Sequence, residues 1–139
     1  MLFENNSKKA FIYYQLPGII WTIVIFVLSS IPSLSPPNLG IEWQDKIYHF
    51  IFYMAYAIFL ARAFYFQNYS FKVKQKFWLH TLLFGVLYGI SDEIHQYFVP
   101  GRYMEFADGL ADSLGIIVGV TLFYCRDFLF WKRQPKSTN

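Results

Sequence analysis

The chain has 139 residues, of which 22% are aromatic and only 15% charged, and its net charge is +3. Soluble domains carry about 25% charged residues, and a soluble chain this short would need an unusually large core to bury so many apolar side chains. The composition therefore excludes most classes of soluble protein and favours an integral membrane protein. A single cysteine excludes an internal disulfide, and the histidines lack zinc-finger spacing.

The first predicted span covers residues 11–31, which contain no charged side chain. Its length matches the roughly 20 residues that a helix needs to cross the hydrocarbon core. Lys8 and Lys9 precede it, as in a secretory signal peptide, but no Ala-x-Ala cleavage pattern follows, so we expect it to be retained. Pro17 is tolerated in the first turn of this helix, and Pro32 ends it.

Three further spans are predicted at residues 45–66, 77–99 and 107–130. Charged residues intrude at one end of each, so their uncharged stretches are shorter than that of the first span. No internal repeat divides the chain. The sequence thus predicts an all-α fold, a four-transmembrane-helix bundle formed by a single membrane domain over residues 1–139.

Charge is distributed unevenly between the predicted loops. Basic residues gather at the N-terminus, between the second and third spans, and at the C-terminus: Lys8, Lys9, Arg62, Lys72, Lys74, Lys76, Arg126, Lys132, Arg133 and Lys136. Cytoplasmic loops are enriched in Lys and Arg, so we expect both termini to be cytoplasmic. The acidic residues show the opposite bias and fall mainly at the outer side: Glu42, Asp45, Asp92, Glu93, Glu105, Asp108 and Asp112.

Polar residues from three predicted helices should meet at this outer face. Ionisable side chains within a span cost about 2.5–3.5 kcal/mol each at its centre, so they normally face the bundle interior or a wet cavity. Spacings of four residues place several of them on one helical face. The candidate ligand-binding residues are Asp45, Lys46, His49, Tyr53, Gln96, Arg102, Asp108 and Asp112.

Helix position suggests different roles for the carboxylates. Asp45 and Asp108 lie near predicted helix N-termini, where a carboxylate is stabilised, so a capping role is the simpler interpretation. Asp92 and Glu93 lie near a helix C-terminus, where the helix dipole disfavours them, and this indicates a function. If the protein is an enzyme, the catalytic candidates are Glu93, His95 and Asp92, with Glu93 and His95 as the proton-transfer pair.

Three further features of the sequence concern anion binding, metal binding and helix packing. Arg102 lies in a turn and could hold a phosphate or carboxylate through two parallel hydrogen bonds. Nearby acids and histidines could ligate a metal ion: Asp45, His49, Asp92, Glu93 and His95. Their spacing matches no known ligand signature, so we expect no metal and no cofactor. Gly85 with Gly89, and Gly115 with Gly119, have the GxxxG spacing that lets helices pack closely.

A family resemblance is carried by two segments, DKIYHFIFYMAYA and LYGISDEIHQYFVPGRYMEFADGLADSLGIIVG. They resemble the VanZ-like family over Asp45 to about Gly119, with a D-K-x-x-H start, a D-E-x-H-Q-x-x-x-P-G-R centre and a D-x-x-x-D-x-x-G end. Many members have an asparagine where this chain has Asp112. The resemblance implies a small multi-pass protein of the bacterial cytoplasmic membrane, in a family named for an accessory protein of glycopeptide-resistance clusters linked to teicoplanin resistance.

The expected function is that of a cell-envelope protein whose outer-face polar pocket binds an anionic lipid-linked or glycopeptide-related ligand. Membrane lipids are the expected partners, together with a lipid-linked cell-wall precursor or a glycopeptide, and nucleic acid is not expected. Two alternatives remain open: a non-catalytic structural or accessory membrane protein, and a membrane enzyme that acts on a lipid head group.

Overall fold

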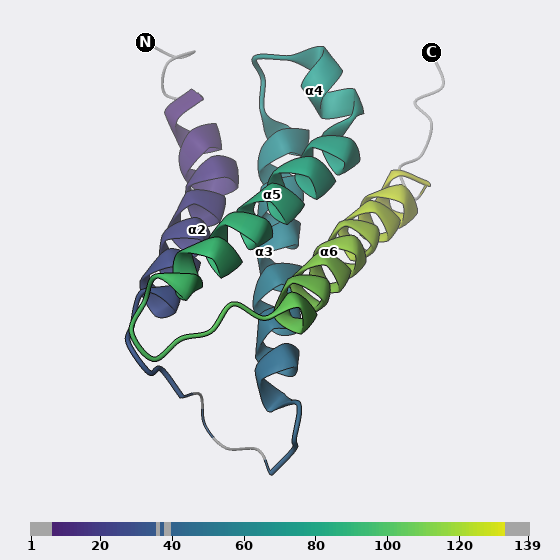
Figure 1. Ribbon diagram of the computed structural model, residues 1–139. Coiled ribbons are helices and arrows are strands. Elements are labelled where there is room, and N and C mark those ends of the chain that lie inside the picture. The colour runs from purple at the N-terminus through teal and green to yellow at the C-terminus, as the bar shows by residue number, and fades with distance from the viewer. Residues whose placement is uncertain (1–6, 36, 38–39, 133–139) are drawn as a thin grey trace, which may run out of the picture.

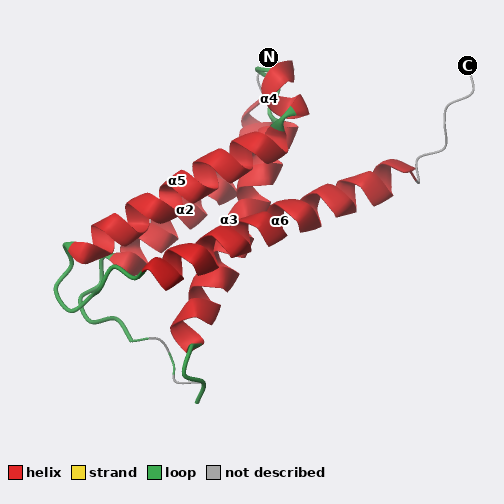
Figure 2. Ribbon diagram, turned by 45° about the vertical axis from the view of Figure 1, so that its right-hand side comes forward, coloured by secondary structure: helices red, strands yellow, loops and turns green. Residues whose placement is uncertain are grey.

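The computed structural model describes residues 7–35, 37 and 40–132, with side chains as far as residue 126. Its elements are η1 (Phe11–Gln15), α2 (Leu16–Ser29), α3 (Gln44–Phe66), α4 (Phe71–Gln75), α5 (Phe77–Tyr97) and α6 (Phe106–Lys132). Loops alone join these helices, and the described residues contain no strand (Figure 2). The prediction of an all-α fold is therefore confirmed.

The long helices run between two ends of the molecule. The beginning of η1, the short helix α4 and the end of α6 lie at one end, whereas the loops before α3 and before α6 lie at the other (Figure 1). Three helical segments in the described chain are long and apolar enough to cross a membrane: Ser7–Ser29, Gln44–Phe66 and Phe106–Arg126. They match the first, second and fourth predicted spans. The helix α5 is not among them, because its last turns contain Asp92, Glu93 and other polar residues that lower its mean hydropathy.

The first helix contains a local change of geometry before Pro17. Helical residues begin at Ser7, and a π-helical segment, η1, directly precedes α2, in which Pro17 is the second residue. Proline has no N–H and its ring clashes with the carbonyl four residues earlier, so a wider turn at this point accommodates it. Pro17 is thus in the first turn of α2, as predicted, but within a longer continuous helix.

Glycines allow α3 and α6 to pack backbone against backbone. A Cβ atom on Gly115 would collide with the carbonyl oxygen of Phe50 and lie 3.0 Å from the nitrogen of Met54. A Cβ atom on Gly119 would collide with the carbonyl oxygen of Met54 and lie 2.8 Å from Cβ of Ala57. The GxxxG spacing in α6 therefore serves close helix packing, as its sequence predicted.

Apolar side chains divide into a small core and a large outer surface. The core cluster lies between α2, α3 and α6 and consists of Ile25, Tyr53, Tyr56, Ala57, Ile116 and Val120. Many other large apolar residues are exposed along the helices, among them Ile19, Ile23, Leu83, Leu87, Leu114 and Ile117. Such continuous apolar surface is expected where helices face lipid.

Candidate functional site

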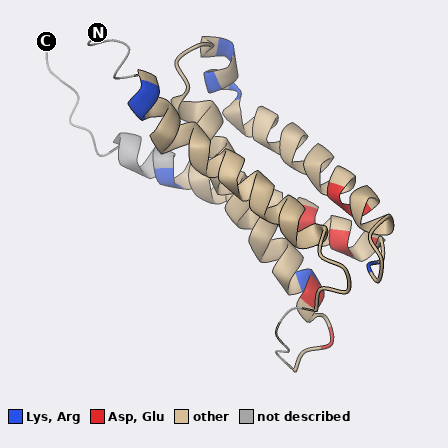
Figure 3. Cartoon of the chain, turned by 90° about the vertical axis from the view of Figure 1, so that its left-hand side faces the viewer, with Lys and Arg blue, Asp and Glu red and all other residues tan. Residues whose placement is uncertain are grey.

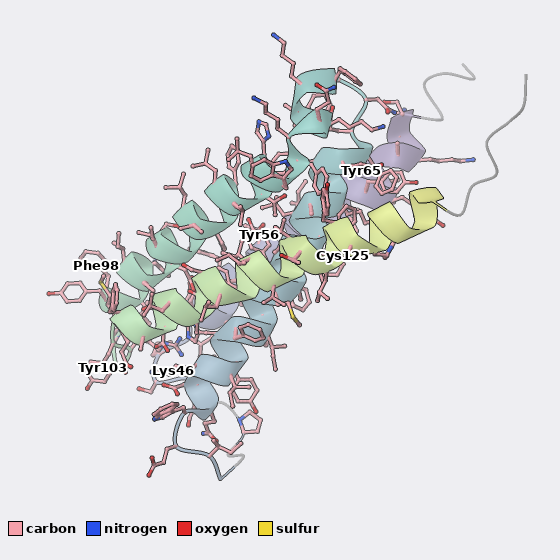
Figure 4. The ribbon with its side chains drawn as sticks, turned by 90° about the vertical axis from the view of Figure 1, so that its right-hand side faces the viewer. Lys46, Tyr56, Tyr65, Phe98, Tyr103 and Cys125 are labelled. Carbon is pink, nitrogen blue, oxygen red and sulfur yellow. The ribbon has the colours of Figure 1, made fainter. Side chains whose placement is uncertain are left out.

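Opposite charges lie at opposite ends of the helices. Acidic residues gather where α5 ends and α3 and α6 begin, and most basic residues that the structure describes lie at the other end (Figure 3). Lys46 and Tyr103 belong to the acidic end, and Tyr65 lies near the opposite one (Figure 4). We call the acidic end the polar end. Arg133 and Lys136 of the predicted basic group lie outside the described residues.

At the centre of the polar end, three long helices meet in a buried group. His49 of α3, Glu93 of α5 and Asp112 of α6 form it, and we call it the His49 cluster. The His49 Nδ1 atom lies 3.0 Å from Asp112 Oδ1 and 3.8 Å from Glu93 Oε1. The exposed fractions of the three side chains are 16%, 4% and 1%. The four-residue spacings predict each of these residues at this depth, and the fold brings them together.

Two oxygens of the His49 cluster are buried without a hydrogen-bond partner in the described chain. They are Glu93 Oε1 and Asp112 Oδ2. The other oxygen of Glu93 accepts a hydrogen bond of 3.0 Å from the backbone N–H of Glu105, which fastens the loop before α6 to α5. An unsatisfied buried carboxylate oxygen is unusual, since buried polar groups almost always find a partner.

Lys46 joins three carboxylates at the rim of the polar end. Its Nζ lies 2.6 Å from Asp45 Oδ2, 2.5 Å from Glu105 Oε2 and 3.0 Å from Asp108 Oδ1. Asp45 and Asp108 lie in the first turns of α3 and α6, as expected from the helix dipole. Besides this position at a helix N-terminus, each also forms an ion pair with Lys46. Of the three, only Asp108 is buried, with a side chain 8% exposed.

A hydrogen-bonded chain links α2, α5 and the loops through Asp92. The hydroxyl of Ser29 donates to Asp92 Oδ1 at 2.5 Å, and Gln96 Nε2 donates to Asp92 Oδ2 at 3.2 Å. Arg102 then donates to Gln96 Oε1 at 2.8 Å and to the carbonyl of Leu34 at 3.2 Å. This chain ties Asp92 to the predicted anion-binding arginine through one intervening amide.

Glu93 and His95 have separate partners. His95 stacks on Phe26 at 4.9 Å between ring centroids, and its Nε2 lies 2.9 Å from the hydroxyl of Ser30. The described contacts therefore do not bring Glu93 and His95 together, and Glu93 lies beside His49 of α3 instead.

Three contact residues were not among the sequence candidates. Ser29 and Ser30 lie at the end of the first span, which the sequence marks only by its lack of charge, and Glu105 stood out only for its charge. Their signal in the sequence was weak. Two serines at a span end are common, and only their position next to α5 gives them partners.

A cavity of about 440 Å³ opens at the polar end. Its polar wall includes Asp45, His49, Asp92, Gln96, Arg102 and Asp108. Its apolar wall includes Ile25, Leu28, Leu34 and Phe52. Tyr53 also lines it, and its hydroxyl is buried without a hydrogen-bond partner among the described residues. Such a cavity can hold a molecule with a polar head and an apolar chain.

Comparison with known families matches residues 5–130 to the family described as VanZ/LLP1. The chain belongs to the VanZ/LLP1 family. The match confirms the resemblance found in two sequence segments and extends it to the first span, whose serines contact α5. Comparisons with curated proteins and with solved structures gave no match. VanZ/LLP1 membership and the three apolar helices together indicate a membrane protein.

Proposed function

We propose that this VanZ/LLP1 chain is a multi-pass protein of the bacterial cytoplasmic membrane, in which α5 forms a fourth span and both termini are cytoplasmic. The outward face of α5 supports this, since large apolar residues are exposed along it: Leu79, Leu83, Leu87, Ile90 and Ile94. Its polar residues Asp92, Glu93 and Gln96 are buried against other helices. The basic residues at the end opposite the polar end favour a polar end that faces outward.

We further propose that the cavity at the polar end binds the anionic head group of a lipid-linked molecule, such as a lipid-linked cell-wall precursor, or a glycopeptide-related ligand. The observation that carries this proposal is that Arg102 lines the cavity with N–H donors to spare. Its guanidinium has five N–H donors and lines the cavity, and the described residues use it for two hydrogen bonds, to Gln96 and Leu34. The remaining donors can form two parallel hydrogen bonds with a phosphate or carboxylate.

The two walls of the cavity fit the two parts of such a ligand. Aliphatic and aromatic side chains on the α2 side can contact an acyl or prenyl chain. Amide and guanidinium groups near the end of α5 can contact the head group. Acidic side chains on the same wall would repel an anion elsewhere in the cavity, so binding should be localised at Arg102.

The test compares Arg102→Ala with Arg62→Ala. Arg62 is a matched control, because it is an arginine near the other end of α3 and does not line the cavity. Its Cζ atom lies 5.2 Å from the centroid of the Tyr14 ring. We expect Arg102→Ala to reach the membrane at the normal level but to lose co-purified anionic lipid and any effect on teicoplanin susceptibility, and Arg62→Ala to keep both. If well-expressed Arg102→Ala retains the lipid and the phenotype, the anion-binding proposal is wrong and an accessory role is preferred.

A second candidate function is an enzyme that acts on a lipid head group. It is favoured by the position of His49, which lines the cavity while Asp112 holds its Nδ1 atom at 3.0 Å. A histidine oriented by a carboxylate is the usual arrangement for a general base. Release of inorganic phosphate from a lipid-linked phosphate by purified protein, and its loss in His49→Ala, would identify this activity. A folded wild-type protein without turnover would leave the binding role as the function.

A further inference from the structure

We propose that His49, Glu93 and Asp112 form a binding site for one divalent transition-metal ion, of the type of Zn²⁺ or Mn²⁺. Each residue offers one donor atom, and the three atoms lie within 4.8 Å of one another. The donors come from three different helices, α3, α5 and α6. No local spacing in the sequence could therefore have revealed this set. The metal site weighed from the sequence shares His49 and Glu93 with it but did not include Asp112.

The distances within the cluster suit a common metal ion. The His49 Nδ1 atom is 3.0 Å from one carboxylate oxygen and 3.8 Å from the other. Nitrogen and oxygen ligands bind Zn²⁺ at about 2.0–2.2 Å, so two ligands of one ion lie roughly 3.0–3.6 Å apart, depending on the coordination angle. The observed distances bracket this range, and small side-chain rotations would bring all three donors to the ion.

The unsatisfied oxygens of this cluster favour a cation site. The Glu93 and Asp112 side chains are 4% and 1% exposed, yet Glu93 Oε1 and Asp112 Oδ2 have no hydrogen-bond partner in the described chain. Leaving a buried donor or acceptor unpaired costs about 1–3 kcal/mol, and more when the group is charged. A metal ion between His49, Glu93 and Asp112 would give Glu93 Oε1, which lies 3.8 Å from His49 Nδ1, the partner that it lacks among the described residues.

Charge balance supports a divalent ion. The nearby Lys46 is already engaged by Asp45, Glu105 and Asp108. A protonated His49 would offset only one of the two carboxylates beside it. With neutral His49, an ion of charge +2 balances both.

The donor chemistry narrows the kind of ion. A neutral imidazole with two carboxylates suits Zn²⁺, Fe²⁺ or Mn²⁺ better than Ca²⁺ or Mg²⁺, which prefer oxygen ligands alone. Three protein ligands leave coordination positions open, as in catalytic rather than structural zinc sites. Of the three residues only His49 lines the cavity, so the ion would lie behind the cavity wall, on the far side of His49.

The neighbouring group of Asp45, Glu105 and Asp108 provides a control. Its three carboxylates also come within ligand distance of one another, but the ammonium of Lys46 occupies their centre. We therefore do not expect a metal there. Asp45→Asn removes one acid from this group and leaves the His49 cluster intact.

The experiment uses the full chain in lipid nanodiscs, stripped with a chelator and titrated with Zn²⁺ or Mn²⁺ alone. Bound metal is measured after gel filtration. We expect one ion per chain for the wild type and for Asp45→Asn. Glu93→Gln and Asp112→Asn should each lower the metal affinity by at least the roughly 10–100-fold seen when a residue that only supports a metal ligand is removed. Equal binding by these variants, or loss only in Asp45→Asn, would overturn the proposal.

A second measurement does not depend on the folding of any variant. X-ray absorption of the Zn²⁺-loaded wild type should show imidazole nitrogen and carboxylate oxygen at about 2.0–2.2 Å and no sulfur ligand. A spectrum without imidazole, with sulfur from Cys125, or a folded wild type that binds no ion would refute the site.

Discussion

The Nδ1 atom of His49 lies 3.0 Å from Oδ1 of Asp112, and this contact joins the beginning of α3 to the beginning of α6. The two helices also pack closely through glycines further along their length. Glu93 adds α5 to the same group. The polar residues of this VanZ/LLP1 protein are thus part of its helix packing as well as of its candidate site.

The first prediction concerns this contact. His49→Ala leaves two buried carboxylates without the imidazole, and breaking such a pair costs about 3–5 kcal/mol. Asp112→Asn should lower the free energy of unfolding by only about 1 kcal/mol, because the amide oxygen still accepts a hydrogen bond. Denaturant unfolding in detergent micelles measures both. The double variant of His49→Ala and Asp112→Ala measures the coupling between the two residues. If its loss of unfolding free energy equals the sum of the two single losses within about 0.5 kcal/mol, the residues are not coupled.

The second prediction separates two glycines of α6. Gly119→Ala should destabilise the protein by about 1–3 kcal/mol, because its Cβ would overlap the carbonyl oxygen of Met54. Gly109→Ala is the matched control, since its Cβ would meet only Cγ of Glu93 at 3.9 Å. Alanine at position 109 should be neutral or stabilising by about 0.5–1 kcal/mol, as expected for a helix interior. Thermal unfolding in detergent can rank the two variants, and similar values would argue against close α3–α6 packing.

The third prediction ranks the partners of Lys46. Asp45→Asn and Glu105→Gln remove carboxylates that are 43% and 49% exposed, so each should change the free energy of unfolding by less than about 1 kcal/mol. Lys46→Met leaves the buried Asp108 carboxylate unpaired and should approach the roughly 3–5 kcal/mol cost of a broken buried pair.

Lys74→Met is the control for the lysine variant. Its ammonium contacts the Tyr65 ring at 5.4 Å, far from the acidic group. Denaturant unfolding of the four variants under identical conditions provides the comparison. A Lys46→Met variant as stable as Lys74→Met would contradict the ranking.

The fourth prediction tests the topology. In a Cys125→Ser background, Met104→Cys should react with a membrane-impermeant maleimide in intact cells, because Met104 lies in the exposed loop between α5 and α6. Tyr69→Cys, in the exposed loop between α3 and α4, should react only after lysis. Reaction of both variants from outside would exclude α5 as a span, and the reverse pattern would invert the protein in the membrane.

The spans could be predicted from the sequence because they depend on local properties. Whether a segment can cross a membrane depends on the length of its apolar run, and α3 begins and ends within one residue of the prediction. The depth of each polar residue followed from its distance to the end of its span. For this reason Asp92, His49 and Asp112 were correctly expected at one end of the bundle.

The pairing of those residues was decided by the tertiary structure alone. Residues two apart on a helix point about 200° away from each other, so Glu93 contacts α3 while His95 contacts α2. Which neighbour each meets depends on how the helices are rotated and how closely they approach, and here glycines in α6 set the approach to α3. The sequence by itself thus determined the helices, the family and the end of the molecule that carries the chemistry. Only packing between distant segments decided that His49, Glu93 and Asp112 form one cluster.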